Sequence, residues 1–421
     1  MPEPRIVPGP RIDGGRSWDW LMQLAALTEA ERPFTRRAFT PLYARGRSWL
    51  VERMRELGLE TRIDPAGNLV GRLAGADPKA AGAILVGSHS DTVIGGGRFD
   101  GAAGVVAGLA IVQALRACGA RLRHAFEVVD FLAEEPNDFG LSCIGSRGMS
   151  GALDEAMLER RSPQGQTLRA GLAQLGAPEG APAAAVRRDI AGCFELHIEQ
   201  GPILEQERVH VGVVTDIVGI RRLAVQFVGQ AAHAGTTPFA LRQDALTAAA
   251  HFLMDLRQAL EQRPATPHVI ATVGEMSIVP NAPNVIPGET RLTVDLRSTD
   301  AQMLQRWTER LQSLVDAAAR VARVRSQVQL LSASTPTACA APLAECLRAA
   351  ASELGYSHRD LVSGAGHDAA FIGRIAPAAM LFVPSRAGLS HCKEEWTEAE
   401  ELTRGFDTLL RAVVRFDTQA A

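Results

Sequence analysis

The chain has little net charge and no long apolar run. Its formal charge is −3 at pH 7 over 421 residues, which gives no support to binding of nucleic acid or an anionic membrane surface. No run approaches the roughly 18 consecutive apolar residues of a membrane-spanning helix. The opening residues, MPEPRIVPGPRIDGG, lack the basic-then-apolar order of a signal peptide. We therefore expect a cytoplasmic protein without nucleic-acid or membrane partners.

Paired cysteines and a phosphate-binding motif are also missing. The six cysteines are scattered, with no CxxC pair, which argues against a zinc ribbon and against a secreted disulfide framework. The glycine-rich turn at residues 95–104 does not fit GxGxxG, and no GK[ST] follows it. A phosphate cradle is therefore poorly supported.

The stretch at residues 83–104 has the order expected at the edge of a parallel sheet. An apolar run leads into His89, Asp91 follows, and Asp100 lies in the glycine-rich turn before an apolar helical pattern. Such a loop lies beyond the carboxyl end of a strand, where α/β proteins build their sites. Imidazole and carboxylate groups in one loop are compatible with a metal site. The alternative is a polar loop in which Asp100 stabilises the helix N-terminus.

Strand and helix patterns alternate in the first half of the chain. The predicted strands are at residues 61–63, 68–73, 83–86, 125–132 and 193–198, and the predicted helices are at 18–27, 41–57 and 105–115. Residues 153–185 indicate helix and surface connection. Strands separated by helical crossovers predict an α/β domain with a mainly parallel sheet and helices on both faces.

From about residue 216 the pattern changes to that of a smaller α+β domain. Strands are predicted at 222–228, 269–278, 290–297 and 324–331, and helices at 238–260 and 301–321. This βαββαβ order is ferredoxin-like. The first kind of pattern returns after Pro336. We therefore expect a discontinuous catalytic domain at residues 1–215 and 332–421, interrupted by a lid or dimerisation domain at 216–331.

Side chains that can bind metal follow several of the predicted strands. Glu134 and Glu135 end one strand, His197 lies in another, and His391 follows the last. A single histidine is usually an ordinary hydrogen-bonded residue, but the carboxyl ends of parallel strands meet at one edge of a sheet. Nitrogen and oxygen ligands suit Zn²⁺, with Mn²⁺, Co²⁺ or Ni²⁺ also possible. Of two adjacent glutamates, one can bind metal while the other takes a proton from water.

Six motifs occur in a specific order along the chain. They are His89-x-Asp91, GGGRFDGAAGV, AEEP, LHIEQGP, AAHAGTTP and SHCKEE. Together they resemble the amidohydrolases of the M20 metallopeptidase-like superfamily. The most similar branch contains N-carbamoyl-L-amino acid hydrolases, allantoate amidohydrolases and β-ureidopropionases. The resemblance implies hydrolysis of a C–N bond in a linear ureido or amide substrate that bears a carboxylate. An N-carbamoyl-L-amino acid, which gives an amino acid, CO₂ and ammonia, is the expected substrate.

The resemblance also implies two divalent metal ions per subunit. His89 and His197 would hold one ion, Glu135 and His391 the other, and Asp100 would bridge them.

Glu134 would be the general base and later the proton donor. Asp91 would lie behind His89 and fix its tautomer.

Residues of the smaller domain would bind the substrate. The resemblance assigns the substrate carboxylate to Arg297, whose planar guanidinium suits it. His233 and Asn284 would stabilise the oxyanion, and His233 would come from the partner subunit of a homodimer. From the residues alone, Arg297 could instead form a strand-end salt bridge, and Asn284 could be a turn residue. Gln200 and Gly366 are further candidates for substrate binding.

Other functions remain open at this point. Within enzymes they are hydrolysis of allantoate, ureidoglycolate or β-ureidopropionate, and aminoacylase or dipeptidase activity. A metal-binding protein without hydrolytic activity is the alternative from another class. The free carboxylate of Glu134 beside Glu135 argues against it.

Overall fold

The computed structural model describes residues 9–178, 186–266 and 268–419. The chain divides into two compact units, which are described separately. The larger unit comprises Met1–Thr215, Ala338–Ser363 and His367–Ala421, and the inserted unit comprises Asp216–Thr337 and Gly364–Gly366. The inserted unit therefore continues beyond residue 331, the predicted boundary, and it gains a short segment from the C-terminal part of the chain.

The larger unit is built on one sheet, which has nine strands in the described residues. These strands are β1 (Glu60–Ile63), β2 (Leu69–Leu73), β3 (Ala83–His89), β4 (Ala125–Phe131), β5 (Ile190–Ile198), β6 (Val211–Ile217), β13 (Thr337–Ala338), β14 (His358–Ser363) and β15 (Ala378–Val383). Their order is β1-β2-β4-β3-β5-β15-β6-β13, and β14 pairs with β6. The central pairs β4–β3, β3–β5 and β5–β15 are parallel. The predicted mainly parallel sheet is thus confirmed, with antiparallel pairs toward its edges.

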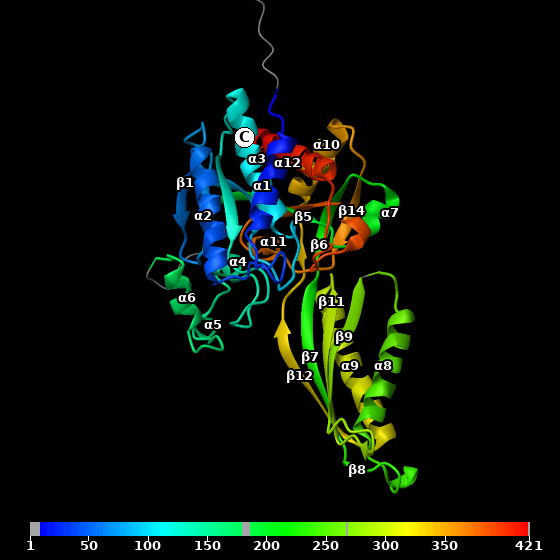
Figure 1. Ribbon diagram of the computed structural model, residues 1–421. Coiled ribbons are helices and arrows are strands. Elements are labelled where there is room, and N and C mark those ends of the chain that lie inside the picture. The colour runs from blue at the N-terminus through cyan, green and yellow to red at the C-terminus, as the bar shows by residue number, and fades with distance from the viewer. Residues whose placement is uncertain (1–8, 179–185, 267, 420–421) are drawn as a thin grey trace, which may run out of the picture. The chain divides into compact units, whose positions relative to one another are not determined.

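Helices cover both faces of this sheet, as predicted. They are α1 (Gly14–Ala26), α2 (Pro41–Glu56), α3 (Ala102–Cys118), α4 (Ile144–Met149), α5 (Glu155–Leu158), α6 (Leu168–Gln174), α7 (Ile203–Glu207), α10 (Ala341–Glu353), α11 (Asp368–Ile372) and α12 (Ala399–Gln419). Alternation along β5 separates the two faces. Phe194 and Leu196 belong to the core cluster that contains α3 and α12, whereas Glu195, between them, accepts a hydrogen bond from Ala369 of α11. Figure 1 shows α1, α3 and α12 side by side.

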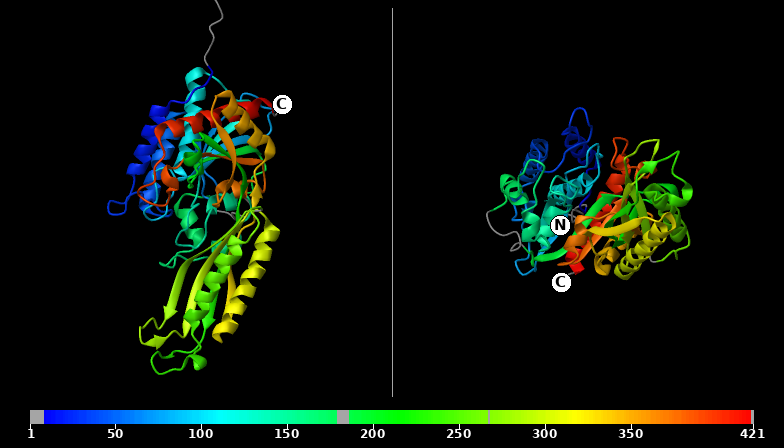
Figure 2. Two further views of the ribbon diagram at one scale, coloured as in Figure 1. Left: turned by 90° about the vertical axis from the view of Figure 1, so that its right-hand side faces the viewer. Right: turned by 90° about the horizontal axis from the view of Figure 1, so that it is seen from below.

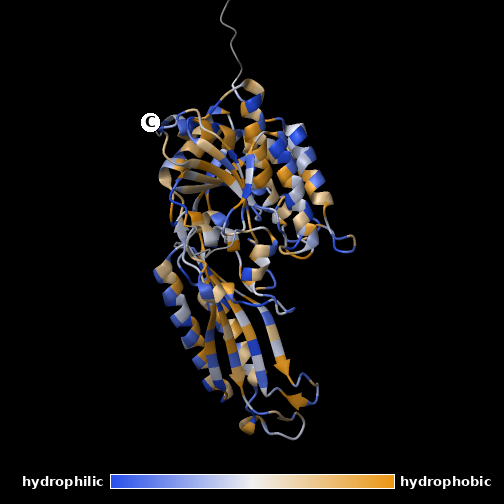
Figure 3. Cartoon of the chain, turned by 90° about the vertical axis from the view of Figure 1, so that its left-hand side faces the viewer, coloured by the Kyte–Doolittle hydropathy of each residue, from blue (hydrophilic) through white to orange (hydrophobic). Residues whose placement is uncertain are grey.

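Local sequence explains where the helices on the core side begin and end. Thr40 caps α2 by accepting from the Tyr43 amide, and Pro41 occupies the first helical position. Helix α3 is apolar on nearly all sides because it lies between the sheet and other helices. It ends at Gly119, whose left-handed conformation suits a residue without a Cβ. In Figure 3 the central strands beneath these helices are largely hydrophobic.

The inserted unit is a two-layer α+β structure. Its main elements are β7 (Gly219–Val228), α8 (Ala245–Glu261), β9 (Val269–Val279), β11 (Glu289–Ser298), α9 (Ala301–Ala322) and β12 (Arg325–Ala333). The strands form an antiparallel sheet in the order β12-β7-β11-β9, which is the ferredoxin-like arrangement of four strands. Both helices pack against one face of this sheet (Figure 2).

The start of α8 corrects one prediction. The helix was expected from residue 238, but residues Phe239–Leu241 form a separate 3₁₀ turn, η2. Asp244 accepts hydrogen bonds from the Leu246 and Thr247 amides, so the α-helix begins at Ala245. A short ribbon is formed by β8 (Ala232–His233) and β10 (Val285–Ile286). Arg242 of the intervening loop donates to the carbonyl of Ala234, which directly follows β8. In the part of the chain described, no helix is long and apolar enough to span a membrane.

Candidate metal centre

Four parallel strands deliver the predicted metal ligands to one edge of the larger sheet. β3 ends at His89, β4 leads into Glu134 and Glu135, and β5 carries His197 near its end. The loop after β15 supplies His391. Because these strands are parallel neighbours, their carboxyl ends meet.

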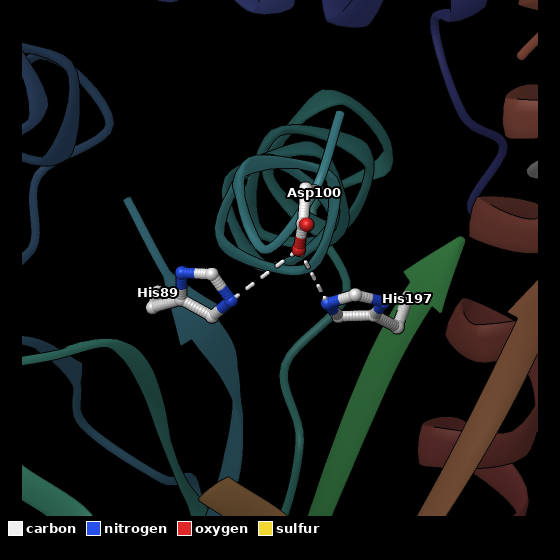
Figure 4. A group of neighbouring side chains, drawn as sticks. All are labelled: His89, Asp100 and His197. Carbon is white, nitrogen blue, oxygen red and sulfur yellow. Dashed lines mark ion pairs between the residues drawn. The ribbon is translucent and has the colours of Figure 1, made fainter. Parts of the chain in front are cut away.

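A first group consists of His89, Asp100 and His197 (Figure 4). Asp100 Oδ1 is 3.6 Å from His89 Nε2 and 3.1 Å from His197 Nε2. All three side chains are buried. The next residue, Gly101, has a φ of 63°, and a Cβ there would lie 2.4 Å from the His89 ring. Glycine therefore lets the chain turn sharply against the imidazole.

A second group consists of Asp100, Glu135 and His391. His391 Nε2 is 3.0 Å from Asp100 Oδ2 and 3.1 Å from Glu135 Oε1. Asp100 Oδ1 thus faces the first group, and Asp100 Oδ2 faces the second. A carboxylate that faces two sets of ligands is the arrangement needed to bridge two ions.

The two buried histidines have their outer ring nitrogens fixed by main-chain carbonyls. His89 Nδ1 is 3.0 Å from the Asp91 carbonyl oxygen, and His197 Nδ1 is 2.9 Å from that of Ile198. His197 Nε2 also accepts a hydrogen bond from the Gly101 amide at 3.2 Å. A proton on Nδ1 leaves a lone pair on Nε2, the atom that faces Asp100. Both rings therefore present Nε2 toward Asp100, and a metal ion bound there would take the place of the hydrogen bond that His197 Nε2 accepts from Gly101.

Asp91 lies behind His89, and it faces the ring with its main chain more closely than with its carboxylate. Its carboxylate lies 3.6 Å from His89 Nδ1, and the closer acceptor is its own carbonyl. The two carboxylate oxygens accept the amide hydrogens of Glu134 and Glu135, each at 3.2 Å. Burial raises the pKa of Asp91 to about 7. Asp91 thus ties the end of β3 to the acidic pair that follows β4.

The electrostatics of the site favour a cation. Burial, followed by the charge of Glu135, raises the pKa of Glu134 well above its usual range. Burial opposes protonation of His89, but Asp91 and Asp100 outweigh it and raise its pKa to about 9. Hydrogen bonds to Asp100 and Glu135 raise the pKa of His391 to about 11. Histidines of both groups therefore hold protons beside Asp100, whose burial is outweighed by hydrogen bonds from His197 and His391, so that its own pKa is lowered well below its usual range. A divalent ion could replace these protons. The nitrogen and oxygen ligands fit Zn²⁺ or a similar ion.

Glu134 stands next to the two groups but belongs to neither. Its Oε2 is 3.7 Å from His89 Nε2. Its Oε1 is 3.4 Å from the thiol of Cys143, a contact that the sequence analysis did not predict. This side chain is therefore available for proton transfer beside the candidate metal ligands.

Gln200 lies against the shared carboxylate. Its side-chain amide donates to Asp100 Oδ2 at 3.0 Å and to Ser390 Oγ at 3.2 Å. Gln200 and His391 are both non-glycine residues in the left-handed region, with φ of 55° and 56°. Such backbone strain is often concentrated at functional sites.

His233 and Asn284 come together at one end of the inserted unit. β8 pairs with β10, so His233 faces Val285 across the ribbon. The Ala234 amide donates to the Asn284 carbonyl at 3.0 Å. Both His233 and Asn284 are exposed. They can therefore serve one binding site.

Arg297 lies toward the other end of β11. Its Nε donates to Asp295 Oδ1 at 2.6 Å and its Nη1 to the Gly364 carbonyl at 2.7 Å. The strand-end salt bridge that the residues alone allowed is thus present. Gly366 follows in the same short segment. The structure does not bring Arg297 together with the β8–β10 ribbon of its own chain. At about 3.4 Å per residue, Arg297 is roughly 25 Å along β11 from the strand's ribbon end.

Known proteins match this chain along nearly its whole length. The model of peptidase family M20/M25/M40 matches residues 85–415. An N-carbamoyl-L-amino-acid amidohydrolase of Paenarthrobacter aurescens is 40% identical over 392 residues, which are 92% of this chain and 94% of that protein. An allantoate amidohydrolase of Bacillus subtilis (strain 168) is 35% identical over 396 residues, with 93% and 94% covered.

A solved structure agrees with these matches. The crystal structure of an amidase of the hydantoinase/carbamoylase family from Burkholderia multivorans is 36% identical. It superposes with a TM-score of 0.89 and covers 97% of this chain and 99% of that one.

Proposed function

The chain belongs to peptidase family M20/M25/M40 and is an amidohydrolase acting on C–N bonds, and we propose that it hydrolyses N-carbamoyl-L-amino acids. The products are the amino acid, CO₂ and ammonia. One observation supports this proposal most directly: Asp100 joins two ligand groups, and Glu134 remains free beside them. A substrate carbonyl and an attacking water both need activation, and this arrangement can supply both.

The proposed reaction assigns a task to each group of residues. The metal positions are formed by His89, Asp100, Glu135, His197 and His391. Divalent ions held by these residues would supply Lewis-acid chemistry, which polarises a carbonyl and makes water easier to deprotonate. Glu134 takes the proton of the attacking water and then delivers it to the leaving nitrogen. His233 and Asn284 donate to the oxygen that gains negative charge. Asp91 keeps Glu134 and Glu135 in place through their amides.

Removal of metal should abolish the activity. Chelation is expected to stop ammonia release from a carbamoyl-amino acid, and added Mn²⁺, Co²⁺, Ni²⁺ or Zn²⁺ should restore it, because the ligands accept all four ions. Metal analysis and ammonia release are measured on the same samples. Full turnover by a preparation verified as metal-free would contradict the proposal.

We propose that Arg297 binds the substrate carboxylate. Arg297→Ala should weaken kcat/KM about ten- to several-hundred-fold, mainly through KM, because a hydrogen bond to a charged group contributes roughly 1.5–3 kcal/mol. Arg297→Lys should recover little, since an ammonium cannot form the bidentate contact. Steady-state kinetics with the acid and with the matched carbamoyl amide provide the measurement. The amide should be a poor substrate that is nearly indifferent to the mutation.

Arg222 provides a matched control for this experiment. It also pairs with Asp295, at 3.2 Å across the neighbouring strand. Arg222→Ala therefore removes a salt bridge to the same carboxylate without removing the proposed substrate contact. If Arg222→Ala and Arg297→Ala raise KM equally, Arg297 has a structural role and the carboxylate assignment must be abandoned.

We propose further that two chains share each active site in a homodimer formed through the inserted unit. The distance along β11 supports sharing, because one copy of this unit cannot bring both Arg297 and the β8–β10 ribbon to one small substrate. The two edge strands of the sheet, β9 and β12, carry exposed apolar side chains that could contact a second copy: Met276 and Val279 on β9, and Leu330 and Leu331 on β12.

Mixing two inactive variants tests the shared site. Glu134→Gln and His233→Ala chains should each be nearly inactive, whereas their mixed dimer contains one site with both wild-type residues. Equal mixing with random exchange should place wild-type residues in about a quarter of the sites, as expected for a twofold dimer. Ammonia release is measured after subunit exchange. No recovery, with mixed dimers demonstrated by mass, would place His233 in its own chain's site, and an active His233→Ala variant would place it outside catalysis.

Because the chain is similar to an allantoate amidohydrolase, allantoate is a second candidate substrate. Allantoate also carries ureido groups and a carboxylate, so the same residues could bind it. Relative kcat/KM for carbamoyl-amino acids, allantoate, ureidoglycolate, β-ureidopropionate and N-acetyl-amino acids distinguishes these activities. We expect kcat/KM to be highest for the carbamoyl-amino acids.

A further inference from the structure

Glu395 is a fully buried carboxylate behind the glycine-rich loop. Its side chain is 0% exposed. Oε1 accepts the amide hydrogens of Phe99 at 2.8 Å and Asp100 at 3.2 Å. Oε2 accepts from the Ser390 hydroxyl at 2.8 Å. One side chain therefore connects the loop of Asp100 to the loop that carries His391.

Gly97 leaves the space that this carboxylate occupies. A Cβ at Gly97 would lie 1.8 Å from the carboxyl carbon of Glu395 and within 2.0 Å of both its oxygens. No side chain can be accommodated at such distances. The glycine is thus required by the close approach of Glu395.

Ser390 connects Glu395 to Asp100 a second time. Its Oγ lies 3.1 Å from Asp100 Oδ2 and 2.8 Å from Glu395 Oε2. A hydroxyl has one proton, so Ser390 can donate to only one of the two carboxylates at a time. Asp100 Oδ2 also faces His391. When Ser390 donates its proton to Glu395, Asp100 Oδ2 does not receive a hydrogen bond from Ser390.

We propose that Glu395 is a positioning residue that holds Asp100 between the two ligand groups, with Gly97 as the space it needs. The proposal rests on the proposed function, in which Asp100 is the shared metal ligand. Glu395 fixes the peptide of Asp100 itself and draws the Ser390 proton away from the metal-binding oxygen. Its loss should therefore weaken binding of both ions while leaving the proton-transfer residue in place.

The surroundings of Glu395 argue against a role in stability alone. Burial of a carboxylate is costly unless it is paired with a cation. The nearby Arg98 donates to the backbone carbonyl of Glu395 at 3.3 Å, and its guanidinium lies over the Phe34 and Trp396 rings. The carboxylate itself is held by two amides and one hydroxyl. A neutral residue of the same size would serve the fold at least as well.

Glu395→Gln tests the proposal with little change of volume. If the glutamine oxygen still accepts the hydrogen bonds of the two amides, its NH₂ group faces Ser390. Ser390 must then accept a hydrogen bond from this NH₂ group, so its own hydroxyl proton turns toward Asp100. Supporting contacts of metal ligands typically cost 10–100-fold in metal affinity when lost. We expect that loss for Zn²⁺ and Co²⁺ in chelator competition, together with a changed Co²⁺ absorption spectrum. Unfolding in excess chelator should be no easier than for wild type.

The matched control is Glu394→Gln, since Glu394 is exposed and lies 3.8 Å from Lys393. Its metal affinity should be that of wild type. Unchanged affinity and Co²⁺ spectrum in Glu395→Gln would overturn the positioning role. If wild type itself bound no metal in the same assay, the proposed function would fail instead.

A double-mutant cycle tests the role of Gly97. Gly97→Ala in wild type should weaken metal binding at least tenfold, because the new methyl group displaces the carboxylate. In a Glu395→Ala background the space is open, so the same change should cost no more than about twofold. Equal losses in both backgrounds would show that Gly97 acts through the backbone and not through Glu395.

Discussion

Asp100→Asn is expected to reduce occupancy of both metal positions at once and to cause the largest loss of activity of any single ligand variant. Asp100 directs Oδ1 toward His89 and His197 and Oδ2 toward His391. The amide that replaces the carboxylate has one oxygen and no charge, so it cannot serve both sides. The loss of kcat/KM should exceed the roughly 10–100-fold typical of a lost supporting contact.

Single-group variants provide the comparison. His197 belongs only to the first group and His391 only to the second. His197→Ala and His391→Ala should each lower occupancy mainly at one position, whereas Asp100→Asn should lower both. Bound metal per folded chain, measured by elemental analysis after dialysis, distinguishes these patterns. Retention of two ions by Asp100→Asn would contradict its bridging position.

The parallel strands explain why the sequence could predict that the candidate ligands lie close together. Once β3, β4, β5 and β15 were identified as buried parallel strands, the residues at their carboxyl ends had to share one edge. His89, Glu135 and His391 come from separate segments, yet this rule was enough to place them together. The same reasoning anticipated the layered fold, since buried parallel strands need helices on both faces.

Details set by hydrogen bonds were not predictable from the sequence. Asp91 was expected to lie behind His89 and fix its tautomer. It faces His89 Nδ1 with its main-chain carbonyl, and its carboxylate instead accepts two amides of the loop after β4. Glu395 lies in the charged run KEE, which resembles a solvated loop, although its side chain is buried. Only the fold shows that Gly97 makes room for it. Periodicity indicates which face a residue occupies, and it does not show which long-range donor its side chain meets.

In the inserted unit, too, a loop boundary and a charged contact could not be settled from the sequence. Its strand and helix order was predictable, whereas the start of α8 depended on the cap at Asp244, which overrides the apolar pattern before it. The contact of Arg297 with Asp295, two residues away on the same strand, was an open alternative from sequence. Its presence does not decide the role of Arg297, because a guanidinium has five N–H donors and can bind a second carboxylate.

Glu134→Gln should nearly abolish turnover while metal binding remains. The substitution keeps the size of the side chain and its capacity to accept from Cys143, whose thiol lies 3.4 Å from Oε1. It removes the group that accepts the water proton, and loss of a general base alone costs about 10²–10⁴-fold. Because Glu134 also returns the proton to the leaving nitrogen in the proposed reaction, the loss should lie toward the upper end and should appear in kcat.

Glu135→Gln provides the matched control, because it makes the same chemical change one residue later. Glu135 lies 3.1 Å from His391 and belongs to the second ligand group. We therefore expect Glu135→Gln to lose metal and Glu134→Gln to keep it, with both variants inactive. Metal analysis and single-turnover kinetics on the same samples separate the two causes. If Glu134→Gln lost metal as readily as Glu135→Gln, or turned over near the wild-type rate with metal bound, another group would have to be the base.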